Sequence, residues 1–134
     1  MSDAEVGTRL RAHDITPTQQ RVDIARILFA RPQHLSAEQV LSIVNRDGQV
    51  VSKATIYNTL NLFARKGLVR EVIVDPNKLF YDSNVSDHHH FYNVDSGELM
   101  DIDSHELRLD QLPTPPDGTE ADGVDIIIRV RRRA

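Results

Sequence analysis

Residues 52–72 read SKATIYNTLNLFARKGLVREV, and this stretch decides what fold we expect. Its first part repeats apolar residues at helical spacing, Ser52 is a suitable N-cap, and Gly67 is a suitable C-terminal stop. After Gly67 the pattern becomes alternating and rich in β-branched residues, as in a strand. We therefore expect a helix from Ser52 to about Lys66, followed directly by a strand. The buried face of that helix would carry Ile56, Leu60 and Phe63.

Two further helices are expected before this stretch. The first spans residues 18–30, with Thr18 as N-cap, and ends where Pro32 disfavours a helical residue before it. The second starts at Ser36, where Gln39 three residues on completes a capping box, and Asp47-Gly48 would end it. Three helices in this order suit a helix-turn-helix domain.

A hairpin is expected after the third helix. Residues 68–74 would form one strand, residues 75–78 the turn, and residues 79–81 the returning strand. Three helices followed by a hairpin predict a winged helix-turn-helix. We assign residues 1–82 to a winged-helix DNA-binding domain.

The rest of the chain reads as a second, smaller module. Residues 90–94 and 98–102 predict two strands around a turn, a short helix is expected over residues 104–111, and residues 124–130 predict a final strand. We assign residues 83–134 to this second module. The expected fold class is thus α+β, with a winged helix-turn-helix joined to a small α/β module.

The polar face of the third helix suits a major groove. Tyr57 could contact a thymine methyl, Asn58 or Asn61 could read an adenine edge, and basic residues could hold phosphates. A solvated helix face in an unrelated α+β domain would give the same pattern. The candidate DNA-binding residues are Lys53, Thr55, Tyr57, Asn58, Asn61 and Arg21, with Arg65 and Lys66 as further phosphate contacts.

Three consecutive histidines indicate a metal site. In a strand His88 and His90 share a face while His89 points away, and the return of the chain would bring Asp101 beside His90. Histidines and carboxylates without sulfur suit Fe²⁺ or Mn²⁺, and Zn²⁺ can occupy such a set in vitro. A surface histidine run without a ligand is the competing interpretation.

Composition excludes several classes of protein. The chain has no cysteine, which rules out disulfides, thiolate zinc sites and cysteine-ligated iron–sulfur clusters. There is no HExxH or comparable motif, so we expect no enzyme. No apolar stretch approaches membrane-spanning length, which predicts a cytoplasmic protein. Residues 1–82 carry 11 Lys and Arg against 9 Asp and Glu, whereas residues 83–134 carry 5 against 11.

Residues 52–72, together with KLFYDSNVSDHHHFYNVDSGELMDID at residues 78–103, resemble the ferric uptake regulator family. The run DHHHFY, the missing cysteines and the ending VDIIIRVRRR look most like its iron response regulator branch. The resemblance implies a homodimer that binds a double-stranded DNA operator, with residues 83–134 as a metal-sensing and α/β dimerisation domain. It also implies a regulatory metal site at five positions, and the peroxide-sensing branch likewise has aspartate at two of them. The implied ligands are His34, Asp82, His88, His90 and Asp101.

Departures from the family pattern change which metal sites we expect in this chain. Asn93 and Ser96 stand where many members have the first cysteine pair of a structural zinc, so we expect no such zinc. A further metal site in the family uses a histidine near the C-terminal end of the chain. Asp125 stands at that position here, so the resemblance does not imply this site. In the iron response branch the histidine run is associated with haem, which makes His88, His89 and His90 candidate haem ligands. The expected function is an iron- or haem-responsive regulator. A peroxide- or manganese-responsive regulator is the alternative, and a metal buffer or metalloenzyme is the competing class.

Overall fold

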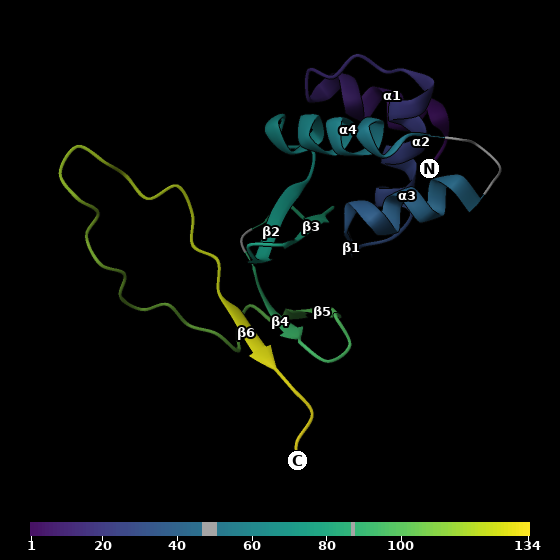
Figure 1. The fold of residues 1–134 in the computed structure, drawn as a ribbon. Coiled ribbons are helices and arrows are strands. Elements are labelled where there is room, and N and C mark those ends of the chain that lie inside the picture. The colour runs from purple at the N-terminus through teal and green to yellow at the C-terminus, as the bar shows by residue number, and fades with distance from the viewer. Residues whose placement is uncertain (47–50, 87) are drawn as a thin grey trace. The chain divides into compact units, whose positions relative to one another are not determined.

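The computed structural model describes residues 1–46, 51–86 and 88–134. It divides into two compact units, Met1–Val85 and Ser86–Ala134, and each is described by itself (Figure 1). The chain is α+β, as predicted, since the helices lie in unit 1 and each unit contains a β-sheet. Within the described residues, no helix has both the length and the apolar character needed to cross a membrane.

The described part of unit 1 contains four helices: α1 (Asp3–Ala12), α2 (Gln19–Phe29), α3 (Ala37–Arg46) and α4 (Lys53–Arg65). Three correspond to the predicted helices, whereas α1 was not predicted. Its apolar face is short, since only Val6, Gly7 and Leu10 are buried, but a capping box between Ser2 and Glu5 fixes its start. The predicted stop at Asp47-Gly48 lies outside the described residues.

The helix starts follow the capping signals in the sequence. Ser36 and Gln39 exchange the two bonds of a capping box, at 2.8 Å and 3.2 Å, and the Ser52 hydroxyl accepts from the Thr55 backbone N–H at 3.1 Å. Gly67, with φ +74°, provides the left-handed residue that ends the last helix. The helices pack around one core that includes Leu10, Ile24, Leu28, Val40, Ile56, Leu60 and Phe63, all at most 1% exposed.

A small antiparallel sheet completes unit 1. Its strands are β1 (His34–Leu35), β2 (Arg70–Asp75) and β3 (Lys78–Asp82), in the order β1-β3-β2. The hairpin of β2 and β3 was predicted, but β1 was not, because two residues are too few for a periodic pattern. The register pairs His34 with Asp82 and Leu35 with Tyr81. Four helices and this hairpin form a winged helix-turn-helix.

Unit 2 is a three-stranded sheet of β4 (His89–Asn93), β5 (Leu99–Ile102) and β6 (Ile127–Val130), in the order β5-β4-β6. β4 pairs antiparallel with β5 and parallel with β6. The helix predicted over residues 104–111 is wrong, and the described part of unit 2 contains no helix, so the predicted α/β module is a β-sheet module. Only a turn forms, closed by the Glu106 N–H on the Asp103 carbonyl at 2.9 Å. Such a short segment with no buried face cannot offset the cost of helix nucleation.

Candidate metal centre

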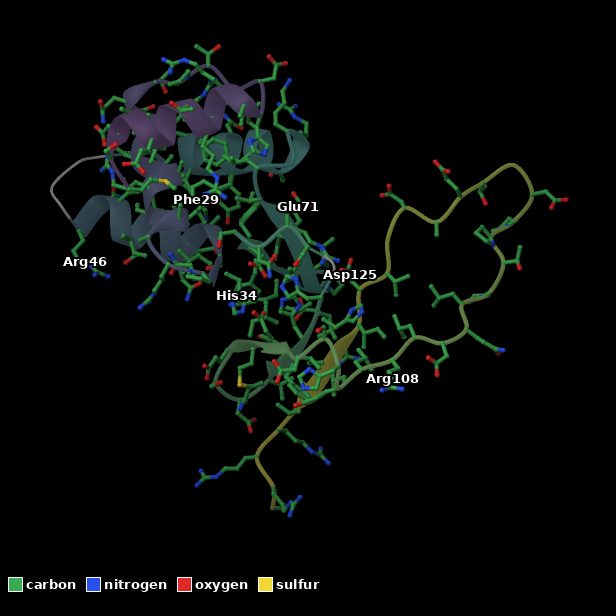
Figure 2. All side chains as sticks on the ribbon, turned by 180° about the vertical axis from the view of Figure 1, so that it is seen from behind. Phe29, His34, Arg46, Glu71, Arg108 and Asp125 are labelled. Carbon is green, nitrogen blue, oxygen red and sulfur yellow. The ribbon has the colours of Figure 1, made fainter. Side chains whose placement is uncertain are left out.

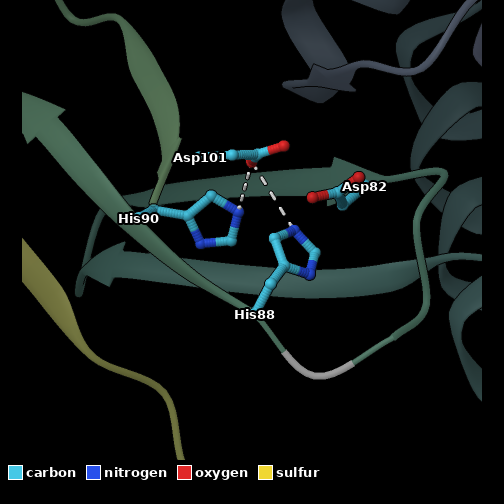
Figure 3. Close-up of side chains that lie close together, drawn as sticks. All are labelled: Asp82, His88, His90 and Asp101. Carbon is cyan, nitrogen blue, oxygen red and sulfur yellow. Dashed lines mark ion pairs between the residues drawn. The ribbon is translucent and has the colours of Figure 1, made fainter. Parts of the chain in front are cut away.

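The β4–β5 pairing assembles a histidine and carboxylate group in unit 2 (Figure 3). The antiparallel register places Asp101 directly opposite His90, and Asp101 Oδ1 lies 3.2 Å from His90 Nε2 and 3.6 Å from His88 Nε2. The donor atoms of the three residues lie within 4.8 Å of one another. Both histidines are buried, at 9% and 1% exposed, whereas the Asp101 side chain is 57% exposed. The group is therefore rooted in the sheet and open on the carboxylate side.

A hydrogen bond at Nδ1 of His88 determines which ring nitrogen can bind a cation. His88 Nδ1 lies 2.7 Å from the Ser86 carbonyl oxygen. A carbonyl can only accept, so Nδ1 donates, and in the neutral ring Nε2 carries the lone pair that faces Asp101. A metal ion placed here would bind both the imidazole lone pair and the carboxylate. A carbonyl that fixes the tautomer of a ligating histidine is a usual partner of a metal site.

His89 is engaged on the other side of the strand. Its Nδ1 accepts a hydrogen bond of 3.0 Å from the Ile126 backbone N–H, just before β6 begins. The His90 N–H donates to the Ile126 carbonyl at 3.1 Å in the same place. Neighbouring histidines therefore have different tasks: His89 attaches the last strand, and His88 and His90 face the carboxylate.

Unit 1 contains a second histidine and carboxylate pair. His34 in β1 and Asp82 in β3 are register partners, and His34 is labelled in Figure 2. The Asp82 side chain is almost fully buried, at 2% exposed, and its Oδ1 accepts from the Asn84 N–H at 2.9 Å. The His34 ring packs edge-on against Phe80, with centroids 6.2 Å apart. Of the five residues singled out in the sequence, His34 and Asp82 belong to unit 1, and the other three belong to unit 2.

Five of the six candidate DNA-binding residues lie on α4, and Arg21 lies on α2. Lys53, Asn58 and Asn61 are exposed, and Tyr57 is half-buried. Of the other two, Thr55 lies in the first turn of α4 and Arg21 lies in α2, where its guanidinium donates to the Thr16 carbonyl at 2.8 Å.

Two residues that sequence reasoning missed hold this surface in place. The Tyr57 hydroxyl donates to the Glu38 carboxylate of α3. The Tyr81 hydroxyl donates to Asn61 Oδ1 at 3.1 Å, so Asn61 is tied to β3. Burial raises the pKa of Tyr81 to about 12, which keeps its hydroxyl protonated as a donor. Neither contact has a signal in the sequence, because each joins residues about 20 positions apart on different elements.

Comparison with known proteins identifies relatives along most of the chain. The profile of the Ferric uptake regulator family matches residues 13–119. A peroxide-responsive repressor PerR of Staphylococcus saprophyticus is 30% identical over 105 residues, which cover 78% of this chain and 70% of that protein. The PerR of Staphylococcus aureus is 31% identical over 93 residues, covering 69% of this chain and 63% of that protein.

Solved structures with the same fold are also found. The structure of the ferric uptake regulator from Pseudomonas aeruginosa with manganese is 26% identical, with a TM-score of 0.71 over 96% of this chain and 98% of that one. The regulator from Francisella tularensis with iron superimposes with a TM-score of 0.70 at 21% identity, over 89% of this chain and 92% of that one. The second likeness supports the fold alone.

Proposed function

The chain belongs to the ferric uptake regulator family, whose members are metal-dependent transcriptional regulators and not enzymes, and we propose that this member responds to peroxide or to manganese. It would bind a double-stranded DNA operator as a homodimer, in the cytoplasm where operators are found. Residues 1–82 would bind DNA, and residues 83–134 would sense metal and form the dimer.

The named relatives favour peroxide or manganese over the iron response role. The two curated relatives reported above are named peroxide-responsive repressors, and the structure at 26% identity is described with manganese. The expectation of an iron response regulator rested on the DHHHFY run, the absence of cysteine and the arginine-rich ending. Nitrogen and oxygen donors without sulfur suit Mn²⁺ and Fe²⁺ equally, so the donor set does not favour the iron role either.

The single observation that carries the proposal is the convergence of His88 and His90 on one carboxylate oxygen. Two imidazole Nε2 atoms and Asp101 Oδ1 form a group of three nitrogen and oxygen atoms that suits a shared divalent cation. We propose His34 and Asp82 as the remaining ligands, because β1 and β3 place them side by side. A divalent ion held there would supply positive charge that neutralises the carboxylates and joins the donors.

Ligands from both units give a route from sensing to DNA binding. His34 and Asp82 belong to unit 1, whereas His88, His90 and Asp101 belong to unit 2. Ligation by all five would hold the two units at one angle. In a dimer that angle sets the separation of the two α4 helices, which must match the spacing of the operator half-sites. The metal-loaded form would then be selected by its higher affinity for DNA.

DNA binding measured in several loading states tests this function. Duplexes are selected from a randomised pool, and their affinity is compared for the metal-free protein and for protein loaded with Mn²⁺, Fe²⁺ or haem. We expect tight binding with Mn²⁺ and Fe²⁺, weak binding without metal, and loss of binding when peroxide is added to the Fe²⁺ form. Binding that ignores peroxide and is abolished by haem would establish the iron and haem role instead. Binding of no duplex in any state would overturn the proposed function.

A further inference from the structure

We propose that Glu38 sets the hydrogen-bonding polarity of Tyr57, so that this side chain accepts hydrogen bonds from DNA bases but cannot donate to them. The inference rests on the proposed function, in which α4 enters the major groove. It adds a specificity-determining residue, Glu38, which contacts no base itself.

The contact joins the two helices of the helix-turn-helix. Glu38 is the second residue of α3, and Tyr57 is the fifth residue of α4. The Tyr57 ring packs partly against the core of unit 1, while its hydroxyl reaches the exposed Glu38 carboxylate and donates to it. A hydroxyl with one proton that is already bonded presents only a lone pair and the ring edge to any further partner.

The charges around the contact keep Glu38 as the acceptor and Tyr57 as the donor. The hydrogen bond from Tyr57 lowers the pKa of Glu38, and the nearby Lys53 ammonium lowers it further. The same hydrogen bond raises the pKa of Tyr57 above its ordinary value, because donation to Glu38 stabilises the protonated phenol. Near neutral pH Glu38 is therefore an ionised carboxylate that can only accept, and Tyr57 is a protonated phenol that must donate.

Base recognition depends on this polarity. In the major groove, adenine and cytosine offer amino donors and thymine offers a methyl group, whereas guanine offers only the acceptors N7 and O6. A phenol with a committed proton can accept from the amino groups and can pack on the methyl group. Against guanine it places a lone pair opposite two acceptors. The contact with Glu38 thus predicts rejection of guanine at the position that Tyr57 meets.

The negative charge of Glu38 indicates a role in specificity and not in affinity. A carboxylate on a DNA-facing surface repels phosphates and weakens binding to every sequence alike. The Lys53 ammonium, 5.8 Å from the Tyr57 ring centroid, partly balances that charge. The useful measurement is therefore the ratio of affinities between duplexes that differ in one base pair.

The test uses full-length protein loaded with Mn²⁺ and a duplex selected from a randomised pool. The position that Tyr57 meets is located by the loss of base preference in Tyr57→Ala. We expect Glu38→Ala to reduce the penalty for guanine there by about threefold to tenfold, because the freed hydroxyl can donate. In a Tyr57→Phe background, Glu38→Ala should leave discrimination unchanged. Glu71→Ala, which removes an exposed carboxylate elsewhere in unit 1 (Figure 2), controls for charge and should shift all affinities alike.

A second measurement reports on the contact between Glu38 and Tyr57 in the absence of DNA. Tyrosine side chains labelled with ¹³C are titrated by NMR, and Tyr57→Phe identifies the Tyr57 signal. Glu38→Ala should return the pKa of Tyr57 towards the ordinary value, and an unchanged titration overturns the inference. Unchanged guanine discrimination in Glu38→Ala, with metal-dependent binding intact, also overturns it while the proposed function stands. If the wild-type protein binds no duplex in any metal state, both are overturned.

Discussion

Tyr81 joins the strand that carries Asp82 to α4, the helix that we propose binds DNA. It lies between Phe80 and Asp82 in β3, pairs with Leu35 of β1, and donates to Asn61 of α4. The residue is almost fully buried, at 1% exposed. A change in the position of β1 and β3 would therefore reach α4 through this hydrogen bond.

Tyr81→Phe tests that link. We expect the free energy of unfolding to fall by about 0.5–1.5 kcal/mol, because one hydrogen bond is lost while the buried ring stays. Chemical denaturation of the metal-free protein measures this change. We also expect a smaller gain in operator affinity on Mn²⁺ addition. Wild-type stability together with a full metal response would show that the Tyr81–Asn61 contact contributes nothing.

Sequence reasoning at the residue scale was strongest where one strand determines the geometry. Alternation along β4 and the return through β5 were enough to place His88 and His90 on one side and Asp101 opposite His90. Glu38 and Tyr81 could not be identified in this way, because their partners lie on other elements. The grouping of His34 with Asp82 came from the family resemblance, since β1 has only two residues.

Elements with strong end signals were predicted well. The starts of α2, α3 and α4 follow from Thr18, Ser36 and Ser52, each of which accepts a backbone hydrogen bond in the first turn. The helix predicted over residues 104–111 failed because charged and apolar residues there do not separate into two faces. The predicted last strand, residues 124–130, is shortened to Ile127–Val130, since only these residues pair with β4.

Ser52→Ala tests the cap of the helix predicted to read DNA. The Ser52 hydroxyl accepts from the Thr55 N–H at 3.1 Å and donates to the Thr55 hydroxyl at 2.9 Å. We expect a loss of about 1 kcal/mol in the free energy of unfolding, measured by urea denaturation. Ser52→Asp preserves an acceptor at the N-cap, so its free energy of unfolding should stay within a few tenths of a kcal/mol of the wild-type value. Equal destabilisation by both substitutions would contradict the capping role.

At the scale of the whole molecule, we propose that the chain dimerises through strand β6. This strand ends the sheet order, with β4 on one side, and Ile128 is 39% exposed. An edge strand with exposed apolar residues is a site for pairing with another chain. We expect the wild-type protein to sediment as a dimer at micromolar concentration and Ile128→Lys to shift it towards monomer. Ile73→Lys, at an exposed isoleucine of β2, is the matched control. A monomeric wild type with intact DNA binding would exclude dimerisation through these strands.

Coupling between the two units is tested most directly at His34, the proposed histidine ligand from unit 1. His34→Ala leaves His88, His90 and Asp101 in place, so we expect metal to bind with reduced affinity. Because the proposed connection to unit 1 is weakened, Mn²⁺ should no longer increase operator affinity. Paired calorimetry and operator binding measure the two effects separately.

Three control variants distinguish this result from general damage. His13→Ala removes a histidine of unit 1 whose Nδ1 bonds the Arg9 carbonyl at 3.0 Å, and it should preserve both metal binding and the DNA response. His88→Ala should lose both, since it removes one of the two imidazoles that meet Asp101. His89→Ala should retain divalent metal, because its Nδ1 faces Ile126 and not the carboxylate. If His34→Ala retains the full response to Mn²⁺, metal bound in unit 2 must act on DNA binding without a histidine ligand from unit 1, and the sensing step then lies within the dimer module.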